Sequence, residues 1–164
     1  MSATRAKATA LLVALQLMAT GISAQSRGVD SVFPARPVGY INDFANLIDP
    51  ATEAGLDTLV QRLKAATGAE VVAVTLPSIG HYEGPDVALA IGRRWGVGAK
   101  ADPGNPSRNA GLVLLVVPRV NHQEGTGHLR IEVGNGLEGI VTDASTVGIG
   151  DVMQPDLERE DYGS

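Results

Sequence analysis

The sequence contains no cysteine among its 164 residues. Without thiols the chain cannot form disulfides, so packing alone must stabilise its fold. The same absence excludes thiolate zinc sites, iron–sulfur clusters and a cysteine nucleophile. Histidine is also scarce. His81, His122 and His128 match no helical zinc motif, and we interpret them as surface residues.

Basic residues are fewer than acidic ones. The chain has 13 lysines and arginines against 18 aspartates and glutamates, which gives a net charge of −5. Proteins that bind nucleic acid need basic patches that replace the counterions of the phosphates. The charge therefore excludes nucleic acid as the expected partner, whereas a surplus of carboxylates suits a hard cation.

The first 24 residues have the pattern of a secretory signal peptide. Arg5 and Lys7 precede an apolar run that is too short to span a bilayer comfortably, and Ser23-Ala24 before Gln25 marks a cleavage site. The alternative is a retained N-terminal anchor. Cleavage would remove two of the 13 basic residues and no acidic one, leaving 11 against 18 and a net charge of −7.

The rest of the chain is expected to form one domain. Residues 25–37 are polar and rich in proline towards their end, so we interpret them as an extended linker before a domain over residues 38–164. Asp49, Pro50 and Gly68 are the cap, first residue and C-terminal glycine of a predicted helix.

Two further helices are predicted in the domain. One covers residues 85–95, and the other runs from Thr142 to about Met153. Pro155 is expected to break this last helix or to start a new one, which the sequence leaves incomplete.

Strands are predicted between these helices. Residues 70–76 are rich in β-branched side chains, and residues 112–117 form the most apolar run after the signal peptide, as expected of a central strand covered on both faces. Residues 128–133 alternate apolar and polar side chains, and the short turn before them predicts antiparallel pairing. This order predicts helices on both faces of a mixed sheet.

Several segments together, in their order and spacing, resemble the TPM domain family of exported bacterial proteins and thylakoid-lumen acid phosphatase-like proteins. The matching stretches are Tyr40-Ile-Asn-Asp43, residues 67–78, Trp95-Gly-Val-Gly98, residues 109–116 and residues 130–139, with Asp143 and Asp161-Tyr162 also in place.

The resemblance implies a three-layer α/β/α sandwich with a mixed central sheet, located in the periplasm or at the outer face of the membrane. It also implies a cleft that binds a divalent cation, with phosphatase or nucleotide (ATP) hydrolase activity, and a membrane anchor beyond residue 164 in a full-length protein. One departure bears on the metal: Asn109-Ala-Gly111 stands where the family commonly has Asp-Asn-Gly, so an amide replaces a carboxylate.

We expect the metal ligands to be Asp43, Asn109, Glu138 and Asp143. Calcium and magnesium are bound by several oxygen donors from separate segments, and these residues would converge if their loops lie at one end of the sheet. Each acid also has a structural interpretation. Asp43 could accept hydrogen bonds within a turn, and Asp143 could complement the dipole of the helix that starts beside it.

Two further motifs have competing interpretations. Gly134-Asn-Gly-Leu-Glu-Gly139 matches the dinucleotide-binding pattern GxGxxG, but too little chain follows for the second half of that fold, which favours a tight loop. Arg93 and Arg94 could contact a phosphate. We prefer the explanation that they lie at the C-terminal end of a helix, where the helix dipole favours positive charges.

Two classes of function remain open. The first is a metal-dependent hydrolase of phosphate esters or nucleotides. The alternative is a non-enzymatic, calcium-stabilised accessory domain that binds an envelope or membrane protein. The sequence contains no P-loop motif that would decide between them.

Overall fold

The computed structural model describes residues 28–98, 102, 104–105 and 108–160. The predicted signal peptide and the Asp161-Tyr162 pair lie outside these residues. In chain order, the elements are the 3-10 turn η1 (Val29–Ser31), β1 (Ile41–Asp43), α2 (Pro50–Thr67), β2 (Glu70–Thr75), α3 (Gly84–Trp95), β3 (Gly111–Val117), β4 (His128–Val133) and α4 (Asp143–Glu158).

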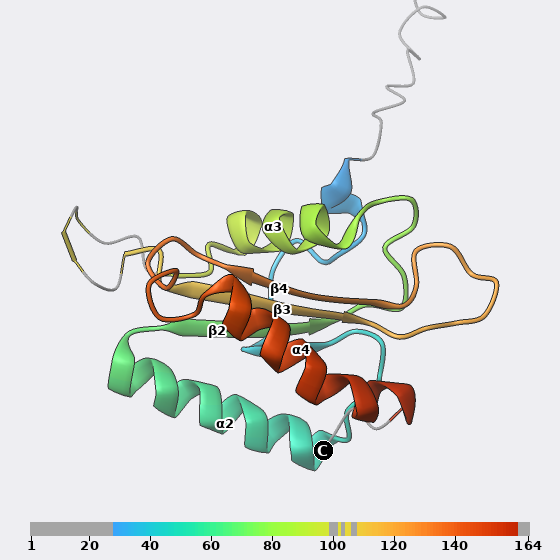
Figure 1. The fold of residues 1–164 in the computed structure, drawn as a ribbon, viewed down its shortest axis with the longest axis horizontal. Helices are drawn as coiled ribbons and strands as arrows, with labels where there is room; N and C mark the ends of the chain where they lie inside the picture. The colour runs from blue at the N-terminus through green and yellow to red at the C-terminus, as the bar shows by residue number, and fades with distance from the viewer. Residues whose placement is uncertain (1–27, 99–101, 103, 106–107, 161–164) are drawn as a thin grey trace, which may run out of the picture.

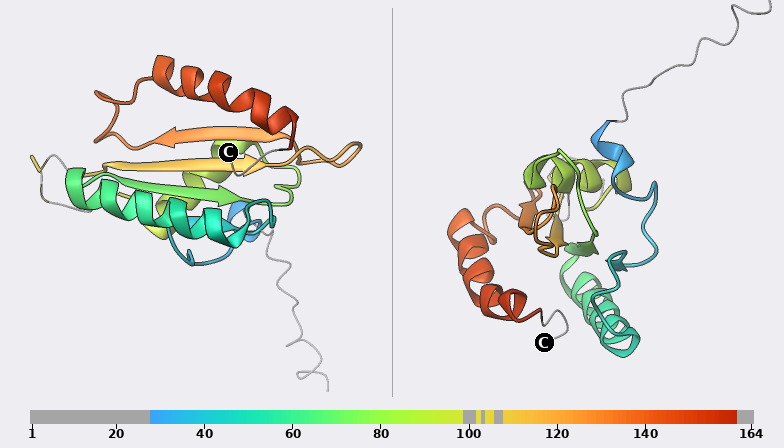
Figure 2. Two further views of the ribbon diagram at one scale, coloured as in Figure 1. Left: turned by 90° about the horizontal axis from the view of Figure 1, so that it is seen from below. Right: turned by 90° about the vertical axis from the view of Figure 1, so that its right-hand side faces the viewer.

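The described strands form one mixed sheet in the order β1-β2-β3-β4. Strands β1, β2 and β3 run parallel, and β4 is antiparallel to β3. Helix α3 covers one face of the sheet, whereas α2 and α4 lie on the other (Figures 1 and 2). The predicted three-layer α/β/α sandwich is confirmed, as is the antiparallel pairing of β4 with a central β3.

Local signals set the ends of α2. The carboxylate of Asp49 accepts hydrogen bonds from the backbone amides of Ala51 and Thr52, at 3.0 and 3.1 Å. Hydrogen bonds from Thr52 and Ala51 lower the pKa of Asp49. Gly68 ends the helix with a φ of 76°, a left-handed conformation that glycine adopts without strain. The predicted caps of this helix are confirmed.

The core lies between α3 and the sheet. Alternate side chains of β2 and β3 point to this face, and they pack against the apolar side of α3. The buried residues that form this cluster are Phe33, Val72, Val74, Leu76, Ile79, Val87, Ala88, Ile91, Val113, Leu115 and Val117. Each large side chain buried in this way contributes about 1.5–3 kcal/mol of hydrophobic stabilisation.

The described part of the predicted linker belongs to the packed domain. Phe33 is 6% exposed, and its ring meets that of Trp95 edge to face at 6.0 Å. The indole nitrogen of Trp95 donates to the carbonyl of Pro34 at 3.0 Å, and Arg94 pairs with Asp30 at 2.8 Å. The domain therefore begins before Val38, because a buried aromatic ring anchors this segment to α3.

The opposite face is covered less completely. Helix α2 leaves Leu59 62% exposed, and no residue of α4 is buried. Helix α4 continues through Pro155, which corrects the predicted break. Proline removes the hydrogen bond to the carbonyl of Asp151. Asp151 is exposed, so water can replace that bond. Within the described part of the chain, no helix is long and apolar enough to cross a membrane.

Candidate functional site

Two loops meet where β3 begins and β4 ends. Leu112 pairs with Val133 in the sheet, so the residues before β3 lie beside those after β4. The amide of Gly134 donates to the carbonyl of Gly111 at 2.8 Å, and the amide of Gly136 donates to the carbonyl of Asn109 at 3.1 Å. These bonds join the loop after β4 to the segment that enters β3.

The first two glycines of the GxGxxG motif allow the two loops to approach each other closely. A Cβ atom on Gly134 would overlap the carbonyl oxygen of Asn109, and one on Gly136 would overlap that of Arg108. Glycine is thus required at both positions by the close approach of another backbone. A dinucleotide site needs a helix that opens within the glycines, whereas α4 begins only at Asp143. The structure supports the interpretation as a tight loop.

Three of the four expected ligands lie at this end of the sheet. Asn109 precedes β3 and has a φ of 55°, and Glu138 follows the buried anchor Leu137 in the loop after β4. Asp143 is in the first turn of α4, which the hydroxyl of Thr142 caps by accepting from the amide of Ser145. All three ligand candidates are exposed. Their side chains make no hydrogen bond or ion pair with any described residue.

Asp43 lies at the other end of the sheet. Its carboxylate accepts from the amides of Leu47 and Ile48, at 3.1 and 2.8 Å, and from the hydroxyl of Thr75. Thr75 ends β2, five residues beyond the residue that pairs with Gly111. At about 3.3 Å per residue, this separates Asp43 from the loop cluster by roughly 16 Å along the strands. The geometry supports the turn interpretation of Asp43.

The donor set consequently differs from the one expected. The structure brings Asn109, Glu138 and Asp143 to one sheet end and leaves Asp43 apart. Among the described residues there is no group of three or more histidines, cysteines, aspartates or glutamates that could hold a metal ion. A cation at this end would need the amide of Asn109 and backbone carbonyls in addition to the two carboxylates.

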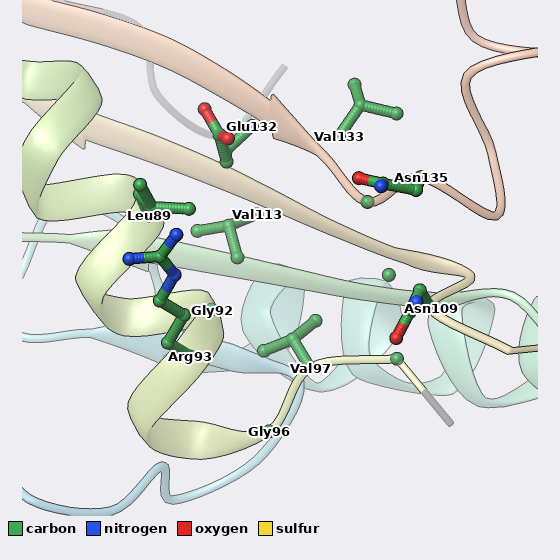
Figure 3. A pocket seen from close by; sticks show the side chains of 13 residues that line it. Leu89, Gly92, Arg93, Gly96, Val97, Asn109, Val113, Glu132, Val133 and Asn135 are labelled. Carbon is green, nitrogen blue, oxygen red and sulfur yellow. The ribbon is translucent and has the colours of Figure 1, made fainter. Parts of the chain in front are cut away.

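A cleft of about 390 Å³ opens beside these loops on the α3 face (Figure 3). Its polar side chains are Arg93, Asn109, Glu132 and Asn135. Its apolar walls come from Leu89, Val97, Val113 and Val133, and the glycines that line it are Gly92, Gly96, Gly98, Gly111 and Gly134. Asn109 belongs to both this cleft and the loop cluster, so the two features are continuous.

A family model described as the TPM domain matches residues 41–164. The chain belongs to the TPM domain family.

A solved structure supports the same assignment. The solution structure of the N-terminal domain of a protein from P. gingivalis is 31% identical to this TPM domain, with a TM-score of 0.61. The match covers 76% of this chain and 72% of that one. No curated protein matches the chain.

In this TPM domain, Glu70 holds the wall of the cleft, a role that the sequence did not reveal. One carboxylate oxygen pairs with the ammonium of Lys64 at 2.9 Å, and the other accepts from the amide of Gly98 at 2.9 Å. The bond to Glu70 raises the pKa of Lys64 despite partial burial. The signal that could have identified Glu70 is a carboxylate at the start of an otherwise apolar strand.

The basic residues at the end of α3 have separate roles. Both arginines lie in the last turn of α3, where cations are favoured, as preferred from the sequence. Arg94 pairs with Asp30, and Trp95 packs against the core. Arg93 instead lines the cleft and makes no hydrogen bond or ion pair with any described residue.

Proposed function

We propose that this TPM domain is an exported module that binds calcium or magnesium through Asn109, Glu138 and Asp143. The observation that carries the proposal is that three oxygen-bearing side chains, none with a described partner, lie at one end of the sheet. Hydrogen bonds between the two loops fix the position of Asn109 relative to the segment that contains Glu138. An unpaired polar side chain at the surface is available for a ligand.

The chemistry of these donors fits a hard cation. Carboxylate, amide and carbonyl oxygens are the ligands that calcium and magnesium prefer. Glu138 and Asp143 would supply two negative charges, and a dication would relieve the repulsion between them. Asn109 supplies a neutral oxygen where the family commonly has a carboxylate, so the Asn109→Asp variant should bind the cation more tightly.

The proposed activity is hydrolysis of a phosphate ester or nucleotide. A bound divalent ion polarises a phosphoryl oxygen and lowers the pKa of bound water. Asn109 also lines the cleft, so the cleft would orient the organic part of the phosphate ester. The label of the matching family model, a TPM phosphatase, supports this reaction class.

Phosphate release from 4-nitrophenyl phosphate by highly purified protein tests the activity. We expect turnover that requires calcium or magnesium, is abolished by chelation, and falls at least about tenfold in Glu138→Gln and Asp143→Asn, as for the loss of metal-site groups. The matched control is Asp151→Asn, an exposed acid on the same helix, which should retain full turnover. Turnover that survives both chelation and the two ligand variants would exclude this active site.

The second candidate is a non-enzymatic, calcium-stabilised accessory domain that binds an envelope or membrane protein. The observation that favours it is the apolar surface left by α2 and α4, where Leu59 is 62% and Val152 75% exposed. Exposed apolar surface of this kind is typical of interaction sites when it forms a patch. Cation binding without any turnover of phosphate esters would favour this function over hydrolysis.

Export is part of both candidates. The pattern of residues 1–24 supports it, with cleavage expected before Gln25. Mass spectrometry of the protein recovered from a bacterial host should find a chain that begins at Gln25 outside the cytoplasm. Recovery of the uncleaved chain in the cytoplasm would contradict export.

A further inference from the structure

The polar groups of the cleft are divided between its two ends. Figure 3 shows Arg93 and Glu132 towards one end, beside Val113, and Asn109 and Asn135 towards the other. The Asn109 end adjoins the proposed cation site, but the Arg93 end has no role in that function. An arginine without a partner at the far end of a cleft needs a separate explanation.

The Arg93 end carries a net positive charge. Glu132 is paired with Arg130 at 3.1 Å, so its carboxylate is already compensated. Arg94, the neighbour of Arg93 in α3, is compensated by Asp30. The guanidinium of Arg93 has no described counter-ion. Its planar donors match the geometry of carboxylate and phosphate oxygens, so this end suits an anionic group.

The cleft also has apolar walls. Leu89 and Val113 lie beside Arg93, and Val97 lies between Arg93 and Asn109 (Figure 3). The volume of about 390 Å³ is close to the lower limit of small-molecule sites, which is about 300 Å³. It suits a single ring or a short carbon chain better than a complete nucleoside triphosphate.

We infer that the cleft takes a compact phosphate monoester that carries a second acidic group at its other end. The phosphate lies at the Asn109 end, an assignment that rests on the proposed function, and the apolar part of the ligand contacts Val97 and Val113. Arg93 binds the second acidic group. It is therefore a specificity residue, which selects dianionic esters over esters with a neutral tail.

The test compares two ligands that differ only in that group, phenyl phosphate and 4-carboxyphenyl phosphate. Their dissociation constants are measured by calorimetry on the full chain with magnesium present. We expect the carboxylated ligand to bind about tenfold more tightly, as for one charge-assisted hydrogen bond. Arg93→Gln should abolish the difference between the two ligands. Arg94→Gln, which removes an exposed ion pair on the same helix, should preserve the difference.

The same titrations in a chelator separate this inference from the cation site. If the tenfold preference persists in the chelator and is lost in Arg93→Gln, the specificity role of Arg93 is supported. This result would hold even if the separate test of Asp143→Asn gave no evidence of a cation site. Equal affinities for the two ligands in the parent, a preference that survives Arg93→Gln, or failure of both ligands to bind would each overturn it. Thermal melting of Arg93→Gln at the temperature of the parent establishes that the variant is folded.

Discussion

Asp43 is predicted to stabilise the fold rather than to bind the cation, and Asp43→Ala tests this directly. The substitution removes the acceptor of the Leu47 and Ile48 amides, at 3.1 and 2.8 Å, and of the hydroxyl of Thr75. Hydrogen bonds to a charged group contribute about 1.5–3 kcal/mol each, and they are not additive in one cluster. We therefore expect a loss of about 3 kcal/mol, or a melting temperature lower by roughly 10 °C.

Urea denaturation and thermal melting measure the loss, and the matched control is Asp102→Ala. Asp102 is an exposed loop aspartate, and its removal should change stability by less than about 0.5 kcal/mol. Calcium should raise the melting temperature of Asp43→Ala by as much as it raises that of the parent. The reasoning is refuted if Asp43→Ala is as stable as Asp102→Ala but no longer responds to calcium, because Asp43 would then be a ligand.

Three other predictions concern single residues. Glu70→Gln weakens the hydrogen bond that holds the wall of the cleft and should cost about 1 kcal/mol in urea denaturation; unchanged stability would refute this role of Glu70. Because the pKa of Asp49 is lowered, its stabilising effect is present above the ordinary value of 3.8 and is lost as the pH falls through the folded-state pKa. Asp49→Ala should therefore lose less stability below about pH 3.8 than the parent does, and equal acid sensitivity would count against the cap. Pro155→Ala restores an amide that can donate to the carbonyl of Asp151, so amide hydrogen exchange in the second half of α4 should slow. Unchanged exchange would mean that the missing hydrogen bond does not limit the stability of this part of the helix.

The elements that the sequence predicted well are those set by local chemistry. Asp49, Pro50 and Gly68 define α2 through hydrogen bonds and backbone conformations within a few residues of each helix end. The apolar run of β3 requires a central position in any fold of this size. By contrast, the packing of Phe33 depends on Trp95, a residue more than sixty positions away, and local composition alone indicated a linker.

Strand direction decides which of the expected ligands share one end of the sheet. Asp43 ends β1, whereas Asn109 precedes β3, which runs in the same direction, so the two lie at opposite ends of the sheet. Glu138 follows an antiparallel strand, which brings it back to the end that contains Asn109. The sequence offered Arg93 and Arg94 as equal candidates for an anion, and only the ion pair of Arg94 with Asp30 separates them. The partners of Glu70, Lys64 and Gly98, likewise became evident only from the folded structure.

The measurement that tests the central claim most directly is the thermal response to a divalent cation. The parent, Glu138→Gln, Asp143→Asn and Asp151→Asn are melted with millimolar calcium or magnesium and with sodium chloride of matched ionic strength. A cation at 100 times its dissociation constant stabilises the folded state by about 2.7 kcal/mol. We predict a rise in melting temperature beyond that with sodium in the parent and Asp151→Asn, and a smaller rise in the two ligand variants. Equal effects of sodium and the divalent cations, or equal responses in all four proteins, would contradict a cation site at this end of the sheet.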